Sequence, residues 1–211
     1  PTLPPFVAIP AGERRGPTLR LARPKVLLTA FPGTNCEYDT AAAFERAGAE
    51  TETLVFRNLD AAAVEESLEA MERAIRRAQI LVIPGGFSAG DEPEGSGKFI
   101  AAAYRNPRVR DAVHDLLQRR DGLMLGICNG FQALIKLGLV PYGDIRPITA
   151  YGPTLTFNTI GRHQSMLVRT RIASTGSPWL SNCAVGDEHT VAISHGEGRF
   201  VAPQEVLDTL I

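Results

Sequence analysis

Two glycines flank a cysteine in the segment Gly126-Ile-Cys128-Asn-Gly130, which follows an apolar run and precedes a helical pattern. A sharp turn from strand to helix leaves room only for small residues beside a nucleophile, which accounts for the glycines. The free N–H groups at the start of the following helix favour the thiolate, the reactive form of cysteine. Most free cysteines are small buried residues, but this context favours a nucleophile at Cys128.

Backbone donors for an oxyanion are expected on two segments near the cysteine. Thiolate attack on a carbonyl carbon creates a tetrahedral oxyanion that hydrogen-bond donors must stabilise. The Asn129 N–H, at the start of the predicted helix, is one candidate. The segment "PGGFSAG" at 84–90 is expected to supply the second donor, Gly86 or Phe87, because its glycines leave a peptide N–H uncovered.

A thiolate of this kind also needs an acid/base partner, which is usually a histidine oriented by a carboxylate. His195, in "ISHGEGRF", follows a predicted strand and has Glu197 two residues further on. From the residues alone, His195 and Glu197 are the favoured base and orienting group. The alternative is that they form a glycine-rich turn beside the substrate.

The elements that must position these residues alternate in type along the chain. Strand patterns at 25–31, 50–56, 79–86 and 122–127 alternate with helical patterns at 36–48, 60–78, 106–120 and from 129 onward. This order predicts an α/β fold, an open and mainly parallel sheet with helices on both faces. Ligands bind beyond the carboxyl ends of such strands, so we expect the loops at 32–35, 84–91 and 128–130 to form one site.

The two ends of the sequence differ from this central pattern. Residues 1–24 contain six prolines and predict a linker, which leaves 25–211 as the domain. Strand patterns at 154–158, 164–172 and 189–195 are expected either to extend the sheet or to form an antiparallel lobe. The final residues resemble the opening turns of a helix, with Pro203 near its start, so we expect the sequence to be a fragment that lacks the C-terminal part of its domain.

Composition excludes several classes of function. The net charge is −1, and no apolar run reaches the ~20 residues of a membrane span, so neither a nucleic acid nor a membrane is expected as a partner. Three scattered cysteines predict neither a disulfide framework nor a zinc site, and favour a cytoplasmic location. Cys36 and Cys183 are expected to be structural, although Cys36 begins a helix on the active face. Phe99 after Lys98 argues against a phosphate loop, so no cofactor is expected in this chain.

Five motifs together resemble a known family: "FPGTNCEYD" (31–39), "GGFSAGDEPEGSGKF" (85–99), "GICNGFQ" (126–132), "NTIGRHQS" (158–165) and "HGEGRF" (195–200). They are similar to class I, triad-type glutamine amidotransferase domains, and more specifically to the glutaminase part of phosphoribosylformylglycinamidine synthases. The resemblance covers about residue 25 to the end. The proline-rich start is similar to the linker that precedes the C-terminal glutaminase domain of the large single-chain form.

The resemblance implies a flavodoxin-like fold and a reaction. Cys128 would attack the side-chain amide of glutamine, and Gln132 would help to hold that substrate. Ammonia would pass to a synthetase domain or subunit, where ATP and magnesium activate formylglycinamide ribonucleotide for conversion to the amidine in purine synthesis.

One departure from the family changes the expected role of His195. The catalytic histidine and glutamate of class I amidotransferases come from a His-Pro-Glu motif, which is not in this sequence. The family's "HGEG" motif lies on the substrate side of the pocket, so the resemblance makes His195 and Glu197 pocket residues. The base is then expected beyond residue 211, and the chain alone is expected to have little or no glutaminase activity. Two alternatives stay open, a DJ-1/PfpI-type cysteine hydrolase and a non-catalytic module that keeps the fold.

Overall fold

A parallel four-stranded sheet forms the centre of the molecule in the computed structural model, which describes residues 8, 21–88, 97–147 and 149–210. Its strands follow the order β2-β1-β3-β4. Their bounds are β1 Lys25–Ala30, β2 Glu50–Val55, β3 Ile80–Ile83 and β4 Leu123–Gly126. Each neighbouring pair is parallel, which confirms the predicted open α/β sheet.

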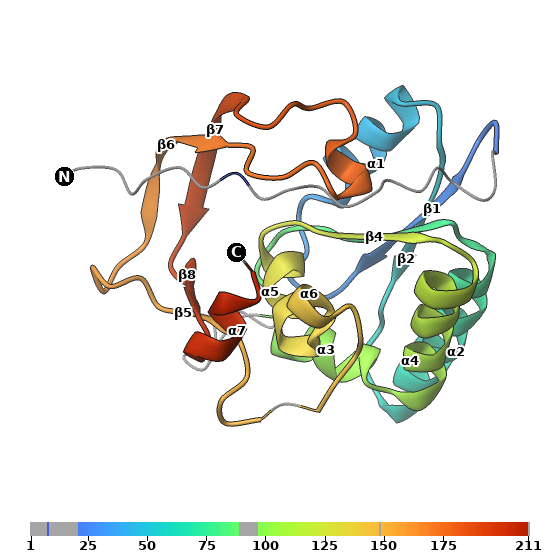
Figure 1. Ribbon diagram of the computed structural model, residues 1–211. Helices are drawn as coiled ribbons and strands as arrows, with labels where there is room; N and C mark the ends of the chain where they lie inside the picture. Colours follow the sequence, from blue (N-terminus) through green and yellow to red (C-terminus); the bar gives the residue numbers. More distant parts are fainter. Residues whose placement is uncertain (1–7, 9–20, 89–96, 148, 211) are drawn as a thin grey trace.

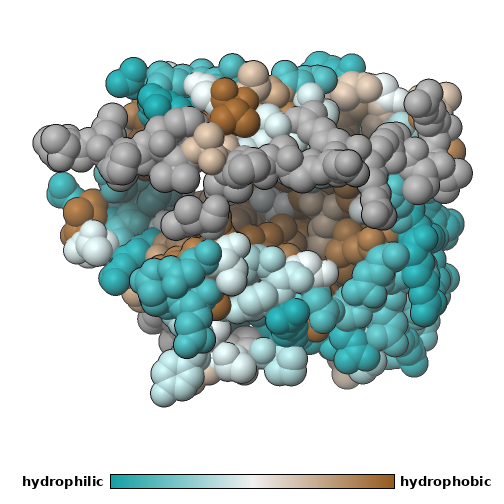
Figure 2. Space-filling model, in the orientation of Figure 1, coloured by the Kyte–Doolittle hydropathy of each residue, from teal (hydrophilic) through white to brown (hydrophobic). Residues whose placement is uncertain are grey.

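Helices cover both faces of this sheet, as predicted (Figure 1). Alternate residues of β1 point to opposite faces: Val26 and Leu28 pack with α1 (Glu37–Arg46), whereas Leu27 packs with the larger cluster on the other face. That second face carries α2 (Ala61–Arg77), α3 (Lys98–Tyr104), α4 (Pro107–His114) and α5 (Asn129–Leu137). The outer surfaces of α2 and α4 are hydrophilic (Figure 2), so their apolar sides face the core.

The second half of the chain adds two antiparallel pairs beside the sheet. After the short helix α6 (Leu139–Tyr142), β5 (Thr154–Thr156) pairs with β8 (Arg199–Val201), and β6 (Gln164–Arg171) pairs with β7 (Glu188–His195). In the described residues these strands pair with one another and do not join the central sheet. Of the two expected arrangements, the strands therefore form the antiparallel lobe and do not lengthen the central sheet. The chain continues into α7 (Gln204–Asp208), which follows Pro203 as predicted.

A tryptophan anchors the lobe to the sheet. The 3-10 turn Pro178–Leu180 presents Trp179, whose indole Nε1–H donates to the Met124 carbonyl of β4 over 3.2 Å. The same ring meets Phe44 of α1 edge to face, with centroids 6.2 Å apart. The lobe is thereby fixed beside the strand that leads into Cys128.

Two predictions lie mostly outside the described residues. The linker at 1–24 is described only at residue 8 and from 21 onward, so its role as a linker stays a prediction. The acidic part of the segment at 90–99 is likewise undescribed; the described residues resume at Gly97, and α3 begins at Lys98. No helix in the described part of the chain is both long enough and apolar enough to cross a membrane.

Candidate active site

Cys128 occupies a strained position between β4 and α5. Its backbone has φ 51° and ψ −107°, a conformation that residues with a side chain adopt rarely and at a cost of about 1–3 kcal/mol. The residue is the N-cap of α5, and its thiol is exposed. Strand, sharp turn and helix therefore follow in the predicted order, and the turn presents the sulfur at the start of a helix.

Close packing explains why glycines flank this turn. A Cβ on Gly130 would lie 2.0 Å from the Ile83 carbonyl oxygen of β3, and a Cβ on Gly126 would lie 2.7 Å from Gly130 itself. The Ile127 N–H also donates to the Ile83 oxygen, over 3.0 Å. The turn is thus pressed against the end of β3, where no side chain fits.

The loop after β3 is paired with the loop after β1. Thr34 and Gly86 form an antiparallel bridge, with the Phe87 N–H donating to the Gly33 oxygen over 2.8 Å and the Asn35 N–H to the Gly85 oxygen over 3.3 Å. These two bonds flank the bridge, which makes Thr34 and Gly86 a non-hydrogen-bonded pair. The Gly86 N–H consequently points away from the 33–35 segment, whereas the Phe87 N–H is engaged with it.

A buried hydrogen-bond chain connects three segments around Cys128. The Ser88 N–H donates to Asn129 Oδ1 (3.2 Å), and Asn129 Nδ2 donates to Gln132 Oε1 (3.0 Å). Gln132 Nε2 then donates to the Glu197 carbonyl oxygen over 3.2 Å. The loop after β3, the first turn of α5 and the "HGEG" turn are thereby joined, and the two residues whose side chains form this path, Asn129 and Gln132, are at most 9% exposed.

His195 lies in a hydrogen-bonded turn organised by Asn158. Its Nδ1 is 3.0 Å from Asn158 Oδ1, which also accepts from the Gly198 N–H over 3.2 Å. In return, Asn158 Nδ2 donates to the carbonyl oxygens of His195 (2.8 Å) and Arg162 (3.0 Å). The sequence motif around Asn158 was noted, but the residue's role as the connection between two turns was not predicted. That connection joins positions 37 residues apart, and a local pattern does not reveal it.

Cys36 lies beside Cys128; the sequence placed the start of its helix on the active face but predicted no closeness of the two thiols. The point where a Cβ on Gly85 would lie is 3.3 Å from Cys128 Cβ and 3.5 Å from Cys36 Sγ. Burial raises the pKa of the Cys36 thiol, and the nearby Cys128 thiolate and the carboxylates of Asp39 and Glu37 raise it further. The two thiols therefore share one small region at the carboxyl ends of β1 and β4.

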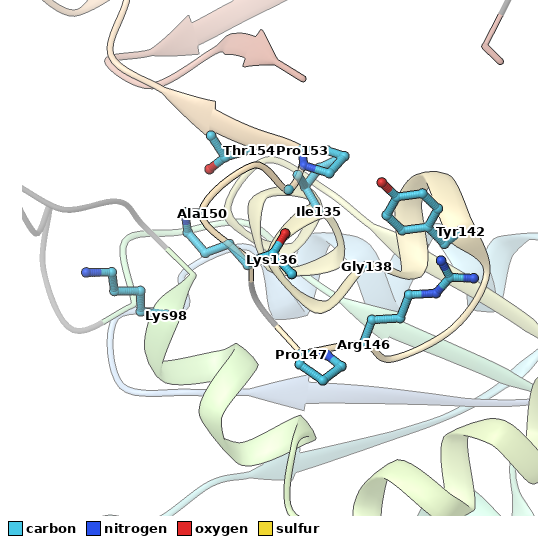
Figure 3. A pocket seen from close by; sticks show the side chains of 12 residues that line it. Lys98, Ile135, Lys136, Gly138, Tyr142, Arg146, Pro147, Ala150, Pro153 and Thr154 are labelled. Carbon is cyan, nitrogen blue, oxygen red and sulfur yellow. The ribbon is translucent and has the colours of Figure 1, made fainter. Parts of the chain in front are cut away.

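A separate cavity of about 430 Å³ lies behind α5, between that helix and the 147–154 segment (Figure 3). Tyr142 and Arg146 lie on one side of it, with the guanidinium 4.3 Å from the ring centroid, and Lys98 lies on the other. Burial lowers the pKa of Lys136, which also lines this cavity, while the charge of Glu197 opposes that shift. None of the residues lining it belongs to the cysteine turn.

One group of side chains in the described residues could hold a metal ion. Cys183, Asp187 and His189 have ligand atoms within 4.8 Å of one another at the start of β7. Asp187 Oδ2 already accepts from the Ala184 N–H over 2.7 Å. The group contains none of the residues around Cys128, so it contributes nothing to the chemistry of that site.

Comparison with known proteins relates this chain to glutamine amidotransferases. The family model for the CobB/CobQ-like glutamine amidotransferase domain matches residues 23–211. Phosphoribosylformylglycinamidine synthase subunit PurQ of Methanococcus maripaludis is 35% identical over 190 residues, covering 89% of this chain and 63% of that protein. The protein of the same name from Dehalococcoides mccartyi is 33% identical over 193 residues, covering 90% of this chain and 68% of its own length.

A solved structure has the same fold. A chain of the PurLQS structure from Thermotoga maritima superposes with a TM-score of 0.60 at 25% identity, covering 85% of this chain and 70% of that chain. The present chain therefore spans most of the matched fold, but only 63% of the length of the M. maripaludis relative.

Proposed function

The chain belongs to the CobB/CobQ-like glutamine amidotransferase domain family, and we propose that its Cys128 is the nucleophile of glutamine hydrolysis. The observation that carries this proposal is the strained backbone of Cys128, which places an exposed thiol at the N-terminus of α5. A helix N-terminus stabilises the thiolate through its free N–H groups and the positive end of its dipole.

The reaction begins when the Cys128 sulfur attacks the side-chain amide carbon of glutamine. The developing oxyanion accepts hydrogen bonds from the Asn129 N–H and the Gly86 N–H. We retain Gly86 over Phe87 because the Phe87 N–H already donates to Gly33. The amide nitrogen takes up a proton from a general acid, the C–N bond breaks and ammonia leaves. Water then hydrolyses the glutamyl thioester to glutamate and frees the thiol.

The polar residues around the thiol position the substrate. Gln132 helps to hold glutamine, and its own amide is fixed between Asn129 and the Glu197 carbonyl. His195 and Glu197 line the pocket and do not serve as base and orienting group. The Nδ1 of His195 is bound by the Asn158 side chain, which places the ring in the turn and makes Asn158, not the expected Glu197, the group that orients it through this nitrogen.

We further propose that the released ammonia passes to a synthetase partner. There, with ATP and magnesium bound to the partner, it converts formylglycinamide ribonucleotide to the amidine in purine synthesis. The names of the relatives support this destination, since they are subunits of phosphoribosylformylglycinamidine synthases. A cytoplasmic location fits this role and the free state of the three cysteines.

The alternatives receive less support. A DJ-1/PfpI-type cysteine hydrolase leaves Gln132 and the loop after β3 without a role, and the amidotransferase family model matches from residue 23 to 211. A non-catalytic module would not explain the strained, exposed cysteine, because backbone strain of this kind persists mainly at positions where function requires it.

The proposal can be tested by combining the natural full-length protein with the synthetase of the same organism. We expect glutamine to support amidine formation with the parent protein but not with Cys128→Ser. Ammonium chloride should support product formation with both proteins, which shows that the synthetase is active. Equal glutamine-dependent product formation with Cys128→Ser would refute the proposal.

A further inference from the structure

Two cysteines meet at the end of the sheet, and only one of them has a role in the proposed reaction. Cys128 Cβ and Cys36 Sγ both lie within 3.5 Å of the point that a Cβ on Gly85 would occupy. Because Gly85 has no side chain, no Gly85 atom occupies the space between the two cysteine side chains. Cys36 is the N-cap of α1, and its thiol donates to Asn35 Oδ1 over 3.2 Å, a bond to its own neighbour that a rotation about Cα–Cβ breaks.

We propose that Cys36 is a resolving thiol that captures oxidised Cys128 as a reversible disulfide. The proposal rests on the proposed function only in taking Cys128 as a reactive thiolate. Cys128 is exposed, so a peroxide reaches it, whereas Cys36 is partly buried behind it. A disulfide requires Cβ atoms about 3.5–4.5 Å apart. The shared contact point on Gly85 makes the two side chains neighbours, so a local shift where β1 and β4 end would bring them to that geometry.

The chemistry has two steps and needs hydrogen peroxide as the oxidant. The Cys128 thiolate attacks one peroxide oxygen, the O–O bond breaks, and Cys128 sulfenic acid and hydroxide form. The Cys36 sulfur then attacks the Cys128 sulfur, the S–O bond breaks, and the Cys36 proton leaves with that oxygen as water. A dithiol reductant afterwards restores both thiols.

The charges at the site favour this order of events. While Cys128 is a thiolate, its charge helps to keep the Cys36 pKa raised and the Cys36 thiol protonated. Sulfenic acid formation removes that charge, so a larger fraction of Cys36 becomes thiolate, the form that attacks. Burial, the larger cause, still raises the Cys36 pKa, but Cys36 becomes more reactive once its neighbour has been oxidised.

The test uses protein carrying Cys183→Ser, so that Cys36 and Cys128 are the only cysteines left among residues 1–211. The reduced protein is first labelled with a glutamine-like electrophile, which tests the proposed function separately. A second sample receives hydrogen peroxide and then iodoacetamide, and is digested without reduction for mass spectrometry. We expect a peptide pair joined through Cys36 and Cys128, and recovery of electrophile labelling after dithiothreitol.

Two variants make the test specific. Cys36→Ser should lower the recovery of Cys128 labelling at least about fivefold, because an unresolved sulfenic acid proceeds to irreversible sulfinic and sulfonic acids. Gly85→Ala keeps both cysteines and places a methyl group 3.5 Å from Cys36 Sγ and in a tight contact of 3.3 Å with Cys128 Cβ, so it should slow disulfide formation about tenfold.

Two results would overturn the proposal. The first is full recovery of labelling in Cys36→Ser after peroxide and dithiothreitol. The second is the absence of a disulfide between Cys36 and Cys128 in peroxide-treated protein, whether Cys128 stays reduced, stays a sulfenic acid or pairs with another chain. A reduced protein that ignores the glutamine-like electrophile but still forms the disulfide would instead refute the proposed function alone.

Discussion

Asn129 Nδ2 donates a hydrogen bond to Gln132 Oε1 over 3.0 Å, one turn further along α5. Both side chains are buried, and each has a second partner on a different loop. A buried polar chain of this kind stabilises a site only while every member is satisfied. The geometry around Cys128 therefore depends on the side chain of Gln132 as well as on the glycines of the turn.

Gln132→Ala should loosen the site. It removes the acceptor of Asn129 Nδ2 and the donor to the Glu197 oxygen, so the free energy of unfolding should fall by about 1–3 kcal/mol. Labelling of Cys128 by a glutamine-like electrophile should slow as well. Urea denaturation and the labelling rate measure the two effects. Exposed Gln118→Ala is the control, and a variant of Gln132 as stable as this control would contradict the prediction.

Gly130→Ala should disrupt the turn itself. The added Cβ would lie 2.0 Å from the Ile83 oxygen, so β3 and α5 must separate, at a cost of about 1–3 kcal/mol or more. We expect a lower thermal midpoint and loss of most Cys128 labelling. Gly176→Ala meets only Ser174 Oγ at 3.5 Å and should behave like the parent protein. Similar labelling in both variants would show that the packing at Gly130 is not needed.

His195→Ala should leave the pH profile of Cys128 labelling unchanged. We assign the ring to the turn with Asn158, where its loss costs stability but moves no proton from the thiol. A histidine that serves as the base would, on removal, shift the pH at which labelling begins. The measurement is the rate of labelling by iodoacetamide between pH 6 and 10, values chosen to span the usual range of thiol pKa. A shift of that profile would restore His195 as the base.

Cys36 should react with iodoacetamide only at higher pH than an ordinary thiol. Its pKa is raised by burial and by the Cys128 thiolate, so at any given pH a smaller fraction is thiolate and alkylation is slower. Cys128→Ser removes one of these causes and should move the Cys36 profile to lower pH. Peptide mass spectrometry resolves the two cysteines. A Cys36 that is alkylated faster than Cys128 would contradict both this prediction and the role of Cys128.

Local patterns predicted the elements that carry the site. Short apolar runs located β1, β3 and β4, and alternation of apolar and polar residues located β2. The glycines at 126 and 130 identified the turn at Cys128. These features depend on neighbours in the chain, so their physical causes are visible in the sequence. The family assignment also followed from such short motifs. The placement of the domain in a large single-chain synthase stays a prediction.

Contacts between distant segments could not be predicted in this way. The closeness of Cys36 and Cys128, the role of Asn158 and the anchoring of the lobe by Trp179 each join residues far apart in sequence. The choice between Gly86 and Phe87 as donor was open for the same reason, because the Phe87 N–H bonds to the Gly33 oxygen only when the two loops pair. Such contacts arise when the sheet brings its loops together, and no period or spacing in the sequence records them.

The most direct test of the central claim is covalent labelling of the reduced protein with a chloroketone analogue of glutamine. The account predicts one adduct, on Cys128, which forms more slowly when glutamine is added and which is not found in Cys128→Ser. Labelling that falls on Cys36 or Cys183, or that glutamine does not slow, would contradict the claim that Cys128 is the nucleophile of a glutamine site.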